Sequence, residues 1–199
     1  MRLAVLVSGR GTNLMAVHGA IGAGTLPAAL ALVAADREAP ALRWAEAQGL
    51  ETFFADARQI GMPAWERELV ARLERAQVDA VVLAGFLRIL SPDFVDRFTG
   101  RIVNVHPSLL PSFPGLDAIG QALRYGVRVT GVTVHFVDHG LDAGPIILQE
   151  AVALHPGESP EELETRVHAV EHRLLPKAVG LLALGRLDVQ GRIVHITEG

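Results

Sequence analysis

Two polar side chains stand where an apolar run of the sequence ends. In "IVNVHPSLLPSFPG", residues 102–115, Asn104 and His106 alternate with valines before three prolines break the run. Successive side chains of a strand point to opposite faces, so Asn104 and His106 share one face. An amide that donates hydrogen bonds and an imidazole that titrates near neutral pH suit a reaction that passes through an oxyanion. The alternative interpretation is structural, with Asn104 fixing a loop and His106 satisfied in the core.

A third group suited to the same chemistry is Asp142. The segment "VTGVTVHFVDHGLDAGPIILQ", residues 129–149, reads as a strand, a turn rich in Gly and Asp, and a second strand, and Asp142 falls in the turn. If the turn folds over the end of the Asn104 strand, the carboxylate orients His106 and favours its protonated form. The three side chains would then be an oxyanion donor, an acid and base, and its orienting partner. Periodicity alone does not place the turn there.

A candidate phosphate site lies near the N-terminus. "SGRGTN", residues 8–13, follows the first apolar run and opens the first helical pattern, where backbone N–H groups favour an anion. Leu14 stands where the dinucleotide fingerprint requires a third glycine, and the Gly-Lys-Ser/Thr ending of a Walker A loop is absent. The turn therefore favours a single phosphate over a nicotinamide cofactor, although Asp36 after the second strand is typical of a ribose-binding acid. A plain tight turn is the other alternative.

Composition limits the classes of protein and partner. The chain has 199 residues, of which 50% are hydrophobic and 20% charged, which is typical of a folded globular domain. It has no cysteine, which excludes disulfides, a thiolate nucleophile and cysteine zinc sites. A formal net charge of -4 gives no reason to expect nucleic acid or an anionic membrane as a partner. The apolar run at residues 3–7 is short and leads into a turn, and no stretch is long enough to span a membrane, so we expect a soluble, cytoplasmic protein.

The elements that must position these residues alternate in type. Short apolar runs interleave with helical patterns as far as residue 105, which predicts an α/β fold. The runs are nearly continuous rather than alternating, so we expect a doubly wound, mostly parallel sheet with helices on both faces. The predicted strands cover residues 3–7, 30–34, 51–54, 80–83 and 102–105. The predicted helices cover residues 13–22, 40–48, 63–76 and 92–98.

The pattern changes after residue 115. We expect a helix over 117–125, strands over 130–137 and 146–152, and a long helix from 160 to about 184. "SPEELE", residues 159–164, supplies a serine cap, a proline in the first turn and acids at the positive end of the helix dipole. Residues 186–196 read as a small hairpin around Gln190 and Gly191.

Five motifs together resemble a known family. "SGRGTNL", "LAGFLRILS", "NVHPSLLPSFPG", "VTGVTVHFVDHGLDAGPIILQEAV" and "RVHAVEHRLLP" occur in the order and spacing of the glycinamide ribonucleotide formyltransferases of purine biosynthesis. The resemblance spans nearly the whole chain. It implies a Rossmann-like formyltransferase fold and transfer of a formyl group from 10-formyltetrahydrofolate, as co-substrate, to the amine of glycinamide ribonucleotide. No metal, nucleic acid or membrane is implied, and the oligomeric state is left open.

The resemblance also implies roles for individual residues. One formyltransferase domain, residues 1–199, would comprise a phosphate-binding half (1–100) and a catalytic and folate-binding half (101–199). The implied catalytic residues are Asn104, His106 and Asp142. The implied ribonucleotide-binding residues are Gly11, Thr12, Asn13, Pro107 and Glu171. The implied folate-binding residues are Leu87, Arg88, Ile89, Leu90, Asn104, His139, Gly140 and Asp142. The chain departs from the family at His139–Gly140, where acids are common, and at Met62, near the place of a folate-side arginine in some relatives.

Other functions compete with this interpretation. Formyltetrahydrofolate hydrolase and formyltransferases of other acceptors share the Asn, His and Asp core, but usually carry an additional domain. From a different class, "HAVEH", residues 168–172, matches the H-x-x-E-H spelling of inverted zinc proteases. Zinc would need a further protein ligand, for which the candidates are Asp188, His195 and Glu198. A noncatalytic folate- or nucleotide-binding module is a third class, and it would tolerate loss of His106.

Overall fold

The structure is a computed structural model, and it describes residues 1–197. The chain forms two compact units, which divide between Val103 and Asn104, inside strand β5 (Ile102–His106). This boundary falls close to the one expected between the two halves. The expectation that both units work as a single formyltransferase domain stays a prediction.

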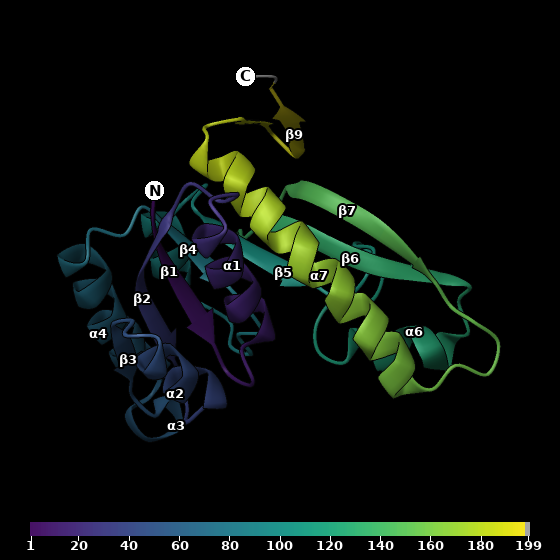
Figure 1. Cartoon of the computed structure of the whole chain (residues 1–199), viewed down its shortest axis with the longest axis horizontal. Helices are drawn as coiled ribbons and strands as arrows, with labels where there is room; N and C mark the ends of the chain where they lie inside the picture. Colours follow the sequence, from purple (N-terminus) through teal and green to yellow (C-terminus); the bar gives the residue numbers. More distant parts are fainter. Residues whose placement is uncertain (198–199) are drawn as a thin grey trace. The chain divides into compact units, whose positions relative to one another are not determined.

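The first unit contains a parallel sheet with the strand order β3-β2-β1-β4 (Figure 1). The pairs β1–β2, β1–β4 and β2–β3 are all parallel. The strands of this unit are β1 (Arg2–Val7), β2 (Ala29–Ala35), β3 (Thr52–Phe54), β4 (Ala80–Leu83) and the start of β5. The helices are α1 (Thr12–Gly22), α2 (Pro40–Ala47), α3 (Ala57–Ile60), α4 (Met62–Arg75) and α5 (Pro92–Arg97).

The connections place helices on both faces of this sheet. The chain steps from β1 to β2 to β3 in one direction and then returns past β1 to β4. Since such crossovers are right-handed, α1 and α2 cover one face and α4 covers the other. Every residue of β4 and every residue of β1 after Arg2 is buried, as their continuous apolar runs predict. The predicted α/β, doubly wound class is confirmed.

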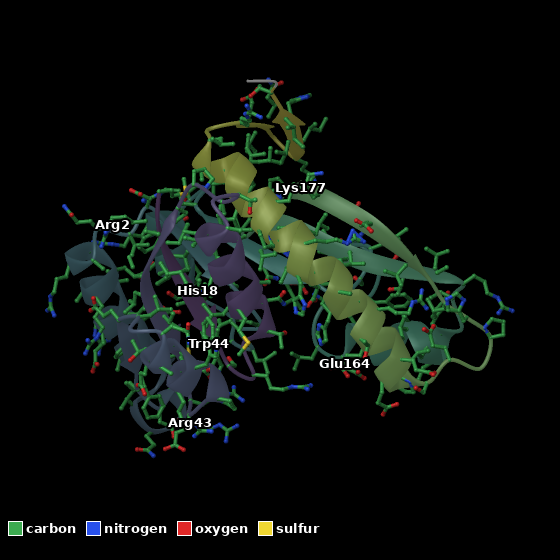
Figure 2. The ribbon with its side chains drawn as sticks, in the orientation of Figure 1. Arg2, His18, Arg43, Trp44, Glu164 and Lys177 are labelled. Carbon is green, nitrogen blue, oxygen red and sulfur yellow. The ribbon has the colours of Figure 1, made fainter. Side chains whose placement is uncertain are left out.

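Aromatic side chains fix both helical layers. Trp65 of α4 is fully buried, lies between Phe53 and Phe86 at ring distances of 6.0 and 5.5 Å, and donates its Nε1 proton to the carbonyl of Ala35. On the other helical layer His18 of α1 meets Trp44 of α2 edge to face, with ring centroids 5.2 Å apart (Figure 2). The buried indole thus contacts Ala35, where β2 ends, and Phe86, which directly precedes the candidate residues Leu87 to Leu90.

The second unit joins an antiparallel strand pair to a long helix. The strand order is β5-β6-β7, with β6 (Val129–Phe136) antiparallel to β7 (Ile146–Ala153). Helix α7 (Pro160–Ala183) packs along β6 and β7, and α6 (Ala118–Tyr125) contacts α7 (Figure 1). Ser159 and Glu162 form the capping box that the sequence predicts. The predicted terminal hairpin is β8 (Leu187–Gln190) and β9 (Ile193–Ile196).

One element was not predicted. Helix α3 has a single turn, too short for a periodic signal, and begins where the Asp56 carboxylate accepts the N–H of Arg58 at 2.9 Å. Within residues 1–197, no helix has the length and apolar character needed to cross a membrane.

Candidate active site

Asn104 and His106 lie on the same face of β5. The intervening Val105 and the preceding Val103 are buried on the other face. His106 is 5% exposed and Asn104 is half-buried. Solvent therefore reaches Asn104 but hardly reaches His106. The pair expected from strand alternation is therefore present in the structure.

Both ring nitrogens of His106 face an acceptor. Nε2 lies 2.8 Å from the carbonyl oxygen of Phe113, which fixes Nε2 as a protonated donor because a carbonyl only accepts. Nδ1 lies 3.4 Å from Oδ2 of Asp142, an ion-pair distance. A doubly protonated ring would thus face a carbonyl on one side and a carboxylate on the other.

Asp142 reaches His106 because its turn is tightly built. Asp142 adopts a left-handed backbone conformation with φ of 48°, and its Oδ2 accepts the N–H of Gly115 at 2.7 Å. A Cβ at Gly144 would stand 1.9 Å from the carbonyl oxygen of Phe136, so only glycine permits this approach. The structure thereby brings the three predicted catalytic side chains together, which the sequence could state only as a condition.

The proline-rich loop after His106 is held by hydrogen bonds to β6 and β7. The hydroxyl of Thr133 donates to the carbonyl of Ser108 at 2.7 Å and accepts the N–H of Leu110 at 3.0 Å. Gln149 donates to the carbonyl of Leu110 at 2.9 Å. The Leu110–Pro111 peptide bond in this loop is cis. These contacts keep the Phe113 carbonyl opposite the imidazole.

His135 is a site residue that the sequence interpretation missed. It is 1% exposed on β6, and its Nε2 lies 3.2 Å from Nδ2 of Asn104 and 3.8 Å from Oδ1 of Asp142. Its Nδ1 lies 2.7 Å from the Phe136 carbonyl, so Nδ1 carries the proton and Nε2 accepts from the Asn104 amide. Burial lowers the pKa of His135, which favours this neutral ring. The available signal was a histidine within a strand that has no other ionisable residue.

The expected phosphate turn of the first unit has the backbone of an anion site. Gly11 precedes α1 with φ of 80°, and a Cβ there would meet the Cβ of Ala41 at 2.6 Å. Thr12 and Asn13 form the first turn of the helix, the end at which the helix dipole favours an anion. Asp36 is fully buried and hydrogen-bonded to protein groups, which argues against a ribose-binding role.

The expected folate residues divide between the two units. In the first unit Leu87 and Ile89 are 53% and 78% exposed, whereas Leu90 is buried and Arg88 pairs with Asp36 at 2.8 Å. Exposed apolar side chains of this size in a loop fit an aromatic ligand. The second unit carries its members on the turn of Asp142. His139 and Gly140 are both exposed there, and the Gly140 N–H donates to Asp138 at 2.9 Å.

Two ribonucleotide candidates belong to the second unit. Pro107 is half-buried directly after His106, and Glu171 of α7 is 3% exposed. The Nδ1 of His168 bonds Oε2 of Glu171 at 2.8 Å, and its Nε2 bonds Glu164 at 3.1 Å. These carboxylates raise the pKa of His168, first through the hydrogen bond to Glu171.

The same contacts argue against zinc at "HAVEH". Both nitrogens of His168 are engaged by carboxylates, which leaves no lone pair for a metal. Across residues 1–197, no group of three or more His, Asp or Glu side chains is placed to hold a metal ion. Glu198, one of the suggested third ligands, lies outside the described residues.

Comparison with known proteins decides the family. The model of the formyl transferase family matches residues 1–179. Phosphoribosylglycinamide formyltransferase of Mycobacterium tuberculosis is 43% identical over 192 residues, which are 96% of this chain and 89% of that protein. The chain belongs to the phosphoribosylglycinamide formyltransferase family. A solved glycinamide ribonucleotide transformylase of Symbiobacterium toebii gives a TM-score of 0.96 at 44% identity, covering 100% of this chain and 94% of the other. The predicted formyltransferase fold and family are both confirmed.

A related hydrolase is more distant from this formyltransferase family member. A formyltetrahydrofolate deformylase from Pseudomonas syringae has a TM-score of 0.91 at 26% identity. The match covers 99% of this chain and only 66% of the deformylase chain. The deformylase therefore shares the fold and contains a further portion that this match leaves uncovered.

Proposed function

We propose that this chain transfers the formyl group of 10-formyltetrahydrofolate to the amine of glycinamide ribonucleotide, a step of de novo purine biosynthesis, with Asn104, His106 and Asp142 as the catalytic residues. The observation that carries the proposal is the meeting of these three side chains around β5 in a member of this enzyme family. His106 lies 3.4 Å from Asp142, and Asn104 sits two residues before His106 on the same face.

The first chemical step creates negative charge that these residues can stabilise. The amine nitrogen bonds to the formyl carbon, and the carbonyl electron pair moves onto the formyl oxygen. Asn104 gives one amide N–H to His135, which leaves the second N–H for that oxyanion. The His106 Nε2 proton, held by the Phe113 carbonyl in the free protein, transfers its hydrogen bond to the oxyanion when substrates bind. Each lost donor of this kind typically costs roughly 100- to 1,000-fold in rate.

The second step breaks the bond between the formyl carbon and the folate N10. The oxyanion re-forms the carbonyl, N10 leaves with the electron pair, and the proton lost by the attacking amine ends on N10. An imidazole beside a carboxylate is suited to move this proton, directly or through water. The formyl group is then bound to the acceptor nitrogen as an amide. These steps need no covalent enzyme intermediate and no nucleoside triphosphate.

The remaining sites are part of the same proposal. The Gly11 turn binds the phosphate of the acceptor through Thr12 and Asn13, and Pro107 and Glu171 contact its glycinamide ribose portion. The exposed loop of Leu87 and its neighbours, with the turn that carries Asp142, binds the folate. A cytoplasmic location also belongs to the proposal, and cell fractionation tests it.

A direct assay tests the acceptor. Tetrahydrofolate formation is followed by absorbance with the full chain and 10-formyltetrahydrofolate, with glycinamide ribonucleotide present or omitted. We expect turnover only with the acceptor, together with a formylated ribonucleotide detected by mass spectrometry. Equal turnover without acceptor would instead identify a formyltetrahydrofolate hydrolase. His106→Ala serves as the inactive control, provided that its thermal unfolding shows a folded protein.

A further inference from the structure

Asp36 is a buried carboxylate that the proposed chemistry does not use. It follows β2 directly, is fully buried, and both of its oxygens are occupied. Oδ1 accepts the hydroxyl proton of Ser8 at 2.6 Å, and Oδ2 accepts the Nε proton of Arg88 at 2.8 Å. Arg37 binds Oδ2 as well, at 3.0 Å from Nη2. Such a group must be held as a charge, because three donors surround it.

The two segments that Asp36 joins carry different candidate subsites. Ser8 begins the turn that leads to Gly11, and Arg88 lies in the exposed loop of Leu87. The segments are far apart in sequence and meet because β1, β2 and β4 are parallel and end at one edge of the sheet. The Ser8 hydroxyl also accepts the N–H of Leu87 at 3.0 Å, and the Ser8 N–H donates to the Gly85 carbonyl at 3.1 Å.

The link to Arg88 depends on Asp36 more than the link to Ser8 does. Ser8 has backbone and hydroxyl bonds to Gly85 and Leu87 in addition to Asp36. The Nη2 atom of Arg88 is buried without a hydrogen-bond partner among residues 1–197, so Asp36 is the main polar anchor of this side chain. Burial raises the pKa of Asp36, but the bonds from Arg37, Ser8 and Arg88 outweigh it and leave a lowered pKa.

We propose that Asp36 is a positioning residue that holds the folate-binding loop, through Arg88, against the phosphate-binding turn, through Ser8. The inference rests on the proposed function, since it concerns how that reaction's two substrate subsites are spaced. Asp36 touches neither substrate. Its negative charge holds the Arg88 side chain and, through it, the loop that carries Leu87, so losing the charge weakens folate binding before it affects acceptor binding.

Asp36→Asn separates the two links. The amide oxygen still accepts the hydrogen bond of the Ser8 hydroxyl. The amide nitrogen replaces Oδ2, so that its N–H and the Nε–H of Arg88 are two donors that face each other with no acceptor between them. We expect KM for 10-formyltetrahydrofolate to rise about tenfold, which is typical for loss of a hydrogen bond to a charged group. KM for glycinamide ribonucleotide should stay within about twofold. A general loss of structure would instead change both constants and kcat together.

Arg37→Ala is the matched control. The substitution removes the other guanidinium from the same carboxylate oxygen, but Arg37 does not belong to the loop of Leu87 and Arg88. We expect both KM values near those of the unsubstituted protein. Arg88→Ala should reproduce the folate-selective defect, and the double variant Asp36→Asn with Arg88→Ala should be no worse than Arg88→Ala alone.

Folate affinity, measured by isothermal calorimetry with folic acid, supplies a readout independent of turnover. A tenfold weaker affinity in Asp36→Asn, with Arg37→Ala unchanged, supports the proposal. Equal changes in both KM values, or no change in either, overturn it. If Asp36→Asn does not fold, Arg88→Ala decides the question by the same criteria. An unsubstituted protein that binds folic acid but does not formylate glycinamide ribonucleotide would refute the proposed function instead.

Discussion

Replacing Asp142 by asparagine removes one negative charge beside His106 and preserves the shape of the turn. Oδ2 of Asp142 accepts the Gly115 N–H at 2.7 Å, and the amide oxygen of asparagine can accept that same bond. The amide nitrogen then takes the place of Oδ1, 3.8 Å from the accepting Nε2 of His135. We therefore expect a folded protein whose free energy of unfolding falls by less than about 1 kcal/mol.

The effect on catalysis follows from the distance to the imidazole. At the 3.4 Å between Nδ1 of His106 and Oδ2 of Asp142, an imidazolium and a carboxylate attract by about 5 kcal/mol at an effective dielectric constant of about 20. Desolvation of both groups offsets part of this attraction. If about half is realised as His106 becomes charged, the loss of 2–3 kcal/mol lowers kcat by roughly 30- to 160-fold.

The assay is tetrahydrofolate formation at saturating concentrations of both substrates, with thermal unfolding recorded in parallel. Asp138→Asn is the matched control, because it neutralises a carboxylate of the same turn whose Oδ1 instead accepts the Gly140 N–H. We expect the control to keep kcat within about threefold. A folded Asp142→Asn variant with kcat above about one third of the original would refute the electrostatic role assigned to Asp142.

Two further predictions test the phosphate turn and His135. Gly11→Ala places a Cβ 2.6 Å from the Cβ of Ala41, at a position where φ is 80°. We expect the free energy of unfolding to fall by about 1–3 kcal/mol and KM for glycinamide ribonucleotide to rise. Gly9→Ala has open space around its Cβ and should change neither quantity, as measured by denaturant titration and a steady-state assay. Because burial lowers the pKa of His135 in the folded state, the unfolded chain binds the extra proton first, and stability should fall as pH decreases from about 6.5. His135→Gln should show a shallower fall between pH 7.5 and 5.5, and equal slopes in the two proteins would contradict the neutral ring.

Most elements of the fold could be predicted because each rests on a local signal. The continuous apolar runs of β1 and β4 are buried on both faces, which is what their composition indicated. The capping box at Ser159 and the strand alternation of Asn104 and His106 are likewise decided by neighbouring residues. Helix α3 was missed because one turn capped by Asp56 has no period to detect.

Several properties of the site could not be predicted. His135 gave only a weak signal, because one histidine in a buried strand is also compatible with a purely structural role. The spacing of Asp36 is typical of a ribose-binding acid, but the structure surrounds its carboxylate with Ser8, Arg37 and Arg88. Which donors surround a buried carboxylate depends on strands brought together from distant parts of the sequence.

The sequence by itself determined the succession along the chain of the strands and of the helices other than α3, the shared face of Asn104 and His106, and, through its motifs, the formyltransferase family. Tertiary structure decided that the turn of Asp142 folds back so that its carboxylate lies 3.4 Å from His106. It also decided that the Phe113 carbonyl accepts from His106 and that His135 accepts from Asn104. The physical reason is the range of the forces concerned. Backbone propensity and side-chain alternation act over a few residues, whereas a catalytic distance is set by the close packing of segments such as Gly144 against Phe136.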